Sequence, residues 1–104
     1  MLFLMYWELN EGVSVADRLL AAEKLMTAKL FPPENIELVR FDITPDNWGI
    51  TLVNAESIEE LSNLNNMWRI ACPGIFKTTK LSPARPVQES IGSTNALLQR
   101  LQSE

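Results

Sequence analysis

The segment SIEELSNLNNMWRIAC, residues Ser57–Cys72, has the beginning, the apolar side and the end of an amphipathic helix. Ser57 and Glu60 have the spacing of a capping box, in which each side chain accepts a hydrogen bond from the other residue's backbone amide. Pro73 and Gly74 end the helix, because proline has no amide hydrogen and disfavours helical geometry in the residue before it. The apolar side chains that recur at helical spacing are Ile58, Leu61, Leu64, Trp68 and Ala71. This apolar side must lie on another layer of structure.

Four segments outside this helix have the composition of β-strands. Met1–Leu9 is apolar on both of its alternating faces, which favours a central strand that is covered on both sides. Ile36–Ile43 and Trp48–Asn54 are separated by the turn residues Thr44–Asn47, which predicts a hairpin. Ile75–Leu81 follows the helix directly, and its lysines and threonines suit an edge strand.

A further helix is predicted between the first two strands. Ser14 is a suitable N-cap, and Asp17 lies where a negative charge favours the helix dipole. The prolines of Phe31-Pro32-Pro33 end this helix. Its predicted apolar stripe consists of Val15, Leu19, Ala22, Met26 and Leu30, with Leu25 beside it.

The predicted order is strand, helix, strand, strand, helix, strand, which is the ferredoxin-like βαββαβ arrangement. The fold class is therefore α+β, with a four-stranded antiparallel sheet and two helices on one face. This domain covers residues 1–87. Residues 88–104 are predicted to form a C-terminal helical tail with Ser93 or Thr94 as its N-cap. The tail needs a surface to lie on, either its own body or a second subunit.

The composition narrows the possible functions. The 104 residues carry a net charge of −4, so no nucleic-acid partner is expected, since phosphate binding needs clustered basic residues. No segment has the roughly 20 apolar residues of a membrane span, so no membrane association is expected. The sequence has no histidine and one cysteine, Cys72, which predicts no metal site, no haem and no other cofactor, and favours a reducing cytoplasm.

Two features carry a resemblance: the opening MLFLMYW, and Trp68 late in its helix, followed directly by a strand that ends in proline. In these features residues 1–87 resemble the dimeric α/β-barrel superfamily, and within it a small uncharacterised family. The resemblance implies a homodimer formed through the open sheet face. The superfamily includes cofactor-free monooxygenases, isomerases and haem-degrading enzymes. The last use a histidine with an asparagine and a tryptophan; Asn10 and Trp68 lie in comparable elements, but the histidine is absent.

The sheet face that helices do not cover carries most of the candidate site. By alternation it displays polar groups on an apolar background, which form either a ligand pocket or, more commonly, the contacts of a dimer interface. The polar residues are Tyr6, Glu8, Arg40, Asp42, Thr51 and one of Lys77 and Lys80, and the apolar ones are Leu2, Leu4, Leu38 and Val53. Trp68 is more commonly a core or pocket-wall residue than one that stacks on a ligand. The ligand-binding candidates are Tyr6, Glu8, Asn10, Arg40, Asp42 and Trp68.

Three functions remain open. The first is a small-ligand-binding barrel protein that holds its ligand between two sheets without evident catalysis, because no reactive constellation is visible. The alternative is a cofactor-independent monooxygenase or isomerase acting on a small aromatic or enolisable substrate. Its candidate residues are Tyr6, Asn10, Arg40 and Trp68. The third is a purely structural interaction protein.

Overall fold

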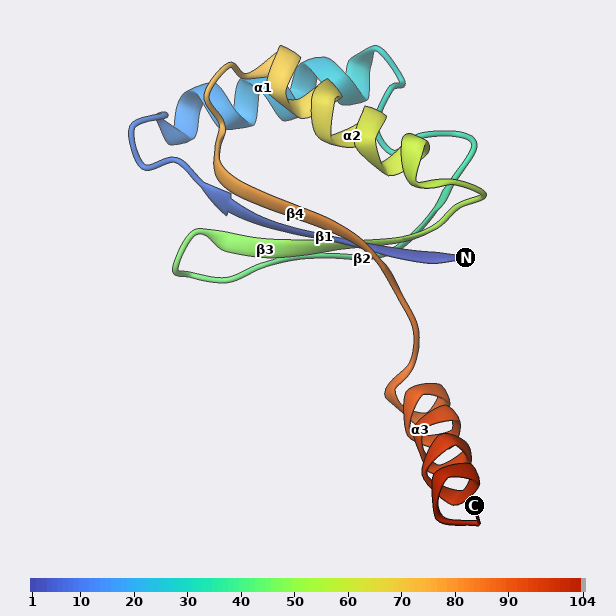
Figure 1. Cartoon of the computed structure of the whole chain (residues 1–104). Helices are drawn as coiled ribbons and strands as arrows, with labels where there is room; N and C mark the ends of the chain where they lie inside the picture. The colour runs from blue at the N-terminus through green and yellow to red at the C-terminus, as the bar shows by residue number, and fades with distance from the viewer. Residues whose placement is uncertain (104) are drawn as a thin grey trace.

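The computed structural model describes residues 1–103 and has a four-stranded antiparallel sheet with two helices layered on one face (Figure 1). The elements in chain order are β1 (Leu2–Leu9), α1 (Val15–Thr27), β2 (Glu37–Ile43), β3 (Trp48–Asn54), α2 (Ile58–Ala71), β4 (Phe76–Ala84) and α3 (Val87–Gln102). This order confirms the predicted ferredoxin-like α+β fold with an additional C-terminal helix. In Figure 1, α3 projects from the end of β4 and lies outside both layers.

The first strand is central, as predicted. The strand order is β2-β3-β1-β4, so β1 pairs with β3 on one side and with β4 on the other. Along β1, buried side chains alternate with half-buried ones. The buried set faces the helices and consists of Phe3, Met5, Trp7 and Leu9. The half-buried set, on the open face, consists of Leu2, Leu4, Tyr6 and Glu8.

Two residues that we predict on the open face, Thr51 and Val53, lie on the helix-covered face instead. They are aligned with Met5 and Phe3 of β1, and residues aligned across neighbouring strands point to the same side of the sheet. Burial alternates along β3 as predicted, but the prediction that Thr51 and Val53 face away from the helices is wrong. Alternation separates the two faces of a strand without saying which face the helices cover.

A β-bulge in β2 moves Leu38 to the helix-covered face as well. Leu38 is aligned with Val53 of β3, and Arg40 with the preceding residue of β3, which leaves Val39 as an extra residue. The alternation therefore reverses at Val39. The prediction for Leu38 is wrong for this reason, whereas Arg40 and Asp42 lie on the open face as predicted.

Helix α2 supplies the centre of the core. Leu61 and Leu64 of α2 are fully buried, which confirms its predicted apolar side. The helix begins after Ser57, but within residues 1–103 the Ser57 side chain makes no capping hydrogen bond. The carboxylate of Glu60 accepts instead from the amide of Glu56, at 3.2 Å. The predicted position of the helix is thus right, and the predicted capping box is wrong.

The other helix of the layer begins at its predicted N-cap. The Ser14 hydroxyl oxygen accepts a hydrogen bond from the amide of Asp17 at 3.1 Å. The helix ends at Thr27, before the prolines, because the chain turns at Lys29, whose φ of 58° is left-handed.

This helix, α1, buries a different side from the predicted one. Its buried residues are Ala21 and Leu25, and Arg18, one turn before Ala21, is half-buried on the same side. Four of the five residues of the predicted stripe are exposed: Val15, Leu19, Met26 and Leu30. The fifth, Ala22, is half-buried, and Leu25, predicted beside the stripe, is buried. Val15 and Leu19 are 60% and 65% exposed, although they lie beside the core.

The end of the chain differs from its prediction at two points. β4 continues through Pro83 to Ala84, and this is compatible with an edge strand, where proline costs no inner hydrogen bond. α3 then begins at Val87, so Ser93 and Thr94 are interior residues and neither is the N-cap. The Ser93 hydroxyl donates to the carbonyl of Glu89. The apolar side chains of α3 are exposed. The last residue of the predicted tail, Glu104, lies outside the described residues.

Gly49 is required by a close approach between β1, β2 and β3. A Cβ atom at this position would lie 2.6 Å from two ring carbons of Trp7 and would collide with the backbone carbonyl of Asp42. We therefore expect Gly49→Ala to lower the free energy of unfolding by about 2 kcal/mol, the scale of overpacking a core. Urea unfolding followed by circular dichroism measures this change.

Gly92→Ala is the matched control for Gly49→Ala. Apart from its chain neighbours and the nearby backbone of α3 itself, no described atom lies within 4 Å of the Cβ that this substitution adds. We expect its unfolding midpoint to stay at or above that of the unsubstituted chain, since alanine favours helix over glycine. An equal loss of stability in both variants would contradict the close packing at Gly49.

Candidate functional site

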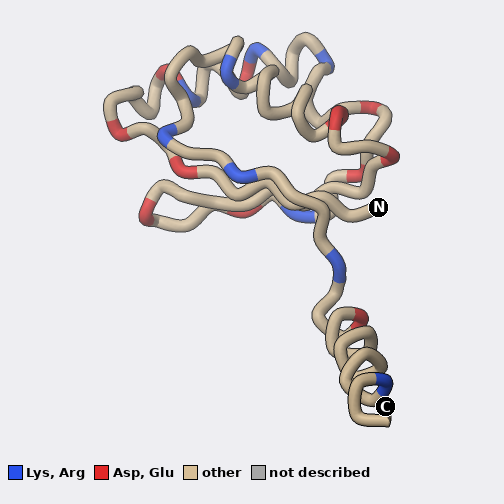
Figure 2. Tube along the Cα trace, in the orientation of Figure 1, with Lys and Arg blue, Asp and Glu red and all other residues tan. Residues whose placement is uncertain are grey.

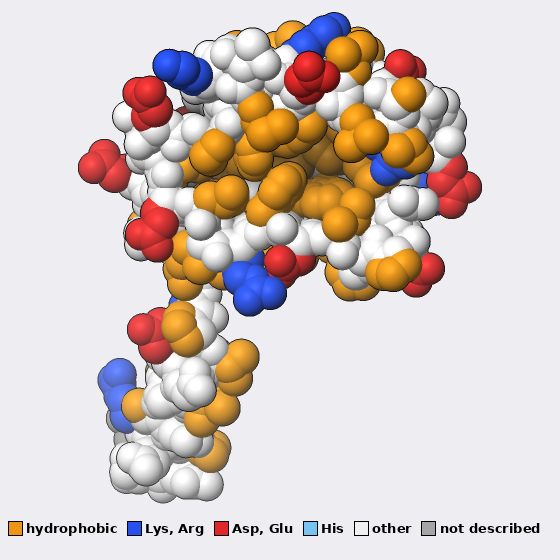
Figure 3. Space-filling model, turned by 180° about the vertical axis from the view of Figure 1, so that it is seen from behind, with side chains coloured by type: hydrophobic (Ala, Val, Ile, Leu, Met, Phe, Trp, Pro, Cys, Tyr) orange, Lys and Arg blue, Asp and Glu red, His pale blue; other side chains and the backbone are white. Residues whose placement is uncertain are grey.

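A cavity of about 360 Å³ lies between the helix layer and the sheet. Figure 3 shows it from outside as a hollow surrounded by hydrophobic side chains. Its walls come from α1, α2, the buried side of β1, the start of β4, and β2 and β3. This volume lies within the range of sites that hold small organic molecules.

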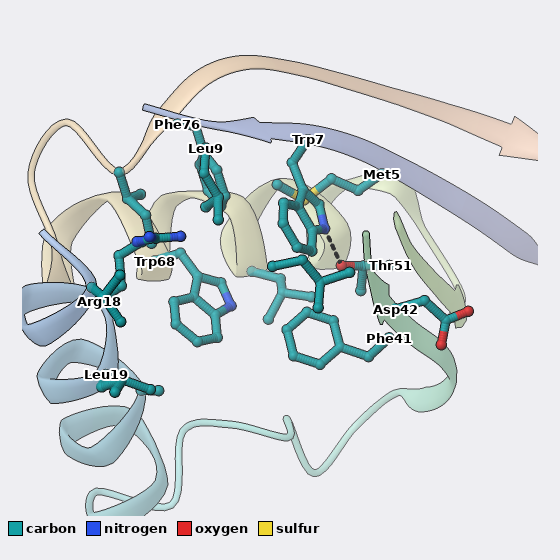
Figure 4. Close-up of a pocket in the computed structure, with 15 residues that line it drawn as sticks. Met5, Trp7, Leu9, Arg18, Leu19, Phe41, Asp42, Thr51, Trp68 and Phe76 are labelled. Carbon is teal, nitrogen blue, oxygen red and sulfur yellow. Dashed lines mark hydrogen bonds between the residues drawn. The ribbon is translucent and has the colours of Figure 1, made fainter. Parts of the chain in front are cut away.

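Three aromatic rings, those of Trp7, Phe41 and Trp68, point into the cavity (Figure 4). The centroid of the Phe41 ring lies 6.1 Å from the ring centroid of Trp7 and 6.3 Å from the ring centroid of Trp68. Behind them, Phe31 packs edge-on against Trp68 at 5.3 Å. The Trp7 indole nitrogen donates to the Thr51 hydroxyl at 3.0 Å, so its one polar atom is satisfied within the protein. The rings therefore present apolar surface to the cavity.

The cavity opens to solvent between α1 and the edge strand β2. Leu19 and Val15 on α1, and Phe41 and Ile43 on β2, line the cavity and are also exposed. Exposed apolar side chains gathered around a hollow are typical of a binding site rather than of ordinary protein surface.

Arg18 is the cavity residue whose charge has no partner. Its Nε atom is buried and, within residues 1–103, forms no hydrogen bond. Arg18 and Trp68 both line the cavity, Arg18 from α1 and Trp68 from α2 (Figure 4). Asp42 also borders the cavity, but its carboxylate points away and accepts from Arg40 at 2.8 Å (Figure 4).

The open face of the sheet carries polar groups that pair with one another. The Tyr6 hydroxyl donates to Glu8 at 3.0 Å, and the ammonium group of Lys80 lies 6.0 Å from the Tyr6 ring. Partial burial raises the pKa of the Tyr6 phenol, and the hydrogen bond to Glu8 and its negative charge raise this pKa further. Arg40 and Asp42 form an exposed ion pair.

The structure divides the six predicted site residues among three places. Four lie on the open face as the pairs Tyr6–Glu8 and Arg40–Asp42. Trp68 lines the cavity on the opposite side of the sheet. Asn10 follows the end of β1, where its side-chain oxygen accepts from the amide of Gly12, and does not border this cavity.

Most of the residues that line the cavity are not among the six candidates, including Trp7, Phe41 and Arg18. The alternation of β1 indicates that Trp7 is buried, but not that a space lies beside it. Arg18 carries the clearer signal, because it is spaced three and seven residues from the buried Ala21 and Leu25. A charged residue in the buried stripe of a helix is unusual and indicates a polar role.

Other kinds of site find no support in the part of the chain that the structure describes. Residues 1–103 contain no group of three or more His, Cys, Asp or Glu side chains that could hold a metal ion. Figure 2 shows Lys and Arg spread among acidic residues over helices and sheet. No helix formed by residues 1–103 is long and apolar enough to span a membrane.

A scan of protein-family models and a search of curated protein sequences find no match to this chain.

Tyr6 is the one tyrosine of the chain, so its titration can be followed directly. Replacing Glu8 by Gln removes a negative charge that stabilises the neutral phenol. We expect Glu8→Gln to lower the pKa of Tyr6 while leaving it above the ordinary value, because burial is the larger cause of the shift. Tyrosinate absorbance against pH measures this. Asp42→Asn, which removes an exposed carboxylate from another pair, is the control, and equal shifts in both variants would contradict the Tyr6–Glu8 pairing.

Proposed function

We propose that this protein binds a small, largely apolar molecule in the cavity between its helix layer and its sheet. The observation that carries the proposal is the aromatic wall of Trp7, Phe41 and Trp68 beside an open mouth. Water in such a cavity has few polar partners, and an apolar ligand that displaces it gains the free energy of burying aromatic surface. This places the ligand on the helix-covered side of the sheet, rather than between two sheets as the sequence argument proposes.

Binding without catalysis is favoured over the enzymatic alternative. A cofactor-independent monooxygenase or isomerase needs a group that exchanges protons with its substrate, within hydrogen-bond reach of it. Of the four residues proposed for that role, Tyr6, Asn10 and Arg40 do not line the cavity. Trp68 does, but an indole supplies surface and a weak donor rather than a base.

We also propose that two copies associate through the open sheet faces, as the resemblance to the dimeric α/β-barrel superfamily implies. Support comes from the apolar residues of that face. They are Leu2, Leu4, Ile50 and Leu52, which are half-buried, and Trp48, which is 39% exposed. A face of this composition is uncommon on a monomer, and a twofold axis would bury both copies of it.

The position of α3 is compatible with this dimer. Only Arg85 and Pro86 separate β4 from α3, and the helix extends away from the sheet instead of folding back over the open face (Figure 1). The open face thus stays available to a second copy, and the exposed apolar side of α3 would pack on that copy.

A reducing cytoplasm remains the proposed location, supported by the single, buried and unpaired cysteine.

The proposed site predicts that filling the cavity abolishes binding. Ala22 of α1 lines the cavity, so we expect Ala22→Phe to place a ring where the ligand lies. Ala16→Phe adds the same ring at an exposed position of the same helix and is the control. The probe is N-phenyl-1-naphthylamine, a neutral aromatic dye whose fluorescence rises in apolar sites. We expect saturable binding to the unsubstituted chain and to Ala16→Phe, and at least a tenfold loss, about 1.4 kcal/mol, in Ala22→Phe.

Two results would contradict the proposed binding site. Equal binding of the dye to both variants and to the unsubstituted chain would show that the dye uses another surface. Absence of saturable binding to the unsubstituted chain would remove the support for a ligand cavity.

The proposed dimer predicts that a charge in the centre of the open face separates the copies. Ile50 is aligned with Tyr6 at that centre, and Ile50→Glu would bury an unpaired carboxylate in the interface. Ile70→Glu is the control, because Ile70 is an 80% exposed residue on the outer side of α2. In sedimentation velocity we expect dimers of the unsubstituted chain and of Ile70→Glu, and monomers of Ile50→Glu. A monomeric unsubstituted chain at micromolar concentration would contradict the proposal.

A further inference from the structure

We infer that the ligand of this cavity carries a carboxylate, and that Arg18 is the residue that binds it. The inference rests on the proposed function and specifies its ligand class: a small aromatic or aliphatic acid with an apolar body. The observations behind it concern one side chain and its surroundings.

Part of the Arg18 guanidinium is buried without a hydrogen-bond partner. Its Nε atom is buried and forms no hydrogen bond within residues 1–103. A guanidinium has five N–H donors, and leaving a buried donor unsatisfied costs free energy. The one ion pair in the described part of the chain is Arg40–Asp42, so no carboxylate of residues 1–103 neutralises Arg18.

The surroundings of Arg18 make its charge effective. Apart from Asp42 and Thr51, the other residues that line the cavity with Arg18 are apolar. Asp42 borders the cavity from β2, but it is neutralised by Arg40 on the open face. A half-buried cation beside apolar walls attracts an anion more strongly than the same cation fully surrounded by water.

A carboxylate matches this site better than other anions. The planar guanidinium binds the two oxygens of a carboxylate side by side. A phosphate carries more charge and is usually held by several cations, whereas Arg18 is the one basic residue among those that line this cavity. The three aromatic rings line the same cavity, so an acid with a flat apolar body could place its head at Arg18 and its body against the rings (Figure 4).

The alternative is that Arg18 only packs its guanidinium against Trp68 and has no role toward a ligand. The two explanations differ in what happens to neutral and acidic ligands of the same shape. A structural arginine affects both ligands equally when it is replaced. A carboxylate-binding arginine affects the acid alone.

The test compares 2-naphthylacetate with 2-(2-naphthyl)ethanol, a neutral analogue of nearly the same shape, by isothermal titration calorimetry. For the unsubstituted full chain we expect the acid to bind at least about tenfold more tightly than the alcohol, the scale of one charge-assisted hydrogen bond. Arg18→Gln should weaken the acid by about tenfold or more and leave the alcohol unchanged. Arg18→Lys should keep part of the preference. Lys24→Gln, at an exposed position of the same helix, should change neither ligand.

The outcomes separate this inference from the proposed function. Equal affinities for acid and alcohol in the unsubstituted chain, or an equal loss of both in Arg18→Gln, would overturn the role of Arg18. In both cases binding of the alcohol would still support the apolar cavity. If neither naphthalene compound binds the unsubstituted chain, the proposed function fails and the inference fails with it.

Discussion

The contact between the indole of Trp7 and the backbone of Gly49 fixes how the central strands lie under the helices. The ring occupies the space in which any larger residue at position 49 would place its Cβ, and its nitrogen is held by Thr51 two residues further along β3. The Trp7 side chain is therefore held in place by its contacts with Gly49 and Thr51 of β3. Its free side, together with Phe41 and Trp68, forms the wall of the cavity. The contact between Trp7 and Gly49 thus packs β1 closely against β3 and leaves a rigid apolar surface facing the helices.

The rotation of α1 about its own axis explains the rest of the site. The helix buries Ala21 and Leu25, and this side also carries Arg18 toward the cavity. The larger residues Val15 and Leu19 are left at the mouth, exposed to solvent. A helix optimised for stability alone would bury its leucine and valine and expose its arginine. Local disagreement between pattern and structure is expected where a protein is shaped for binding, and here it coincides with the cavity.

Much of the fold could be predicted from the sequence, because its signals are local and agree with one another. The apolar side of α2, the N-cap at Ser14 and the hairpin turn before Trp48 all lead to the βαββαβ order. The site could not be predicted to the same degree. Alternation orders the residues of β3 without assigning Thr51 to a face, and a bulge at Val39 leaves no mark in composition. Of the six candidates, Trp68 and Asp42 border the cavity, and the carboxylate of Asp42 points away from it, since a cavity depends on how two layers fit rather than on either layer.

The three tryptophans of the chain can report directly on whether the ligand lies between the helices and the sheet. Trp7 and Trp68 line the cavity, whereas Trp48 lies on the opposite face of the sheet, 5.8 Å from the ring of Tyr6. The measurement is ¹⁹F NMR of the chain labelled with 5-fluorotryptophan, titrated with 2-(2-naphthyl)ethanol, with each resonance assigned by a Trp→Phe variant. We expect the Trp7 and Trp68 resonances to shift together and saturate while the Trp48 resonance stays in place. A shift confined to Trp48 would place the ligand on the open face and contradict the proposed site.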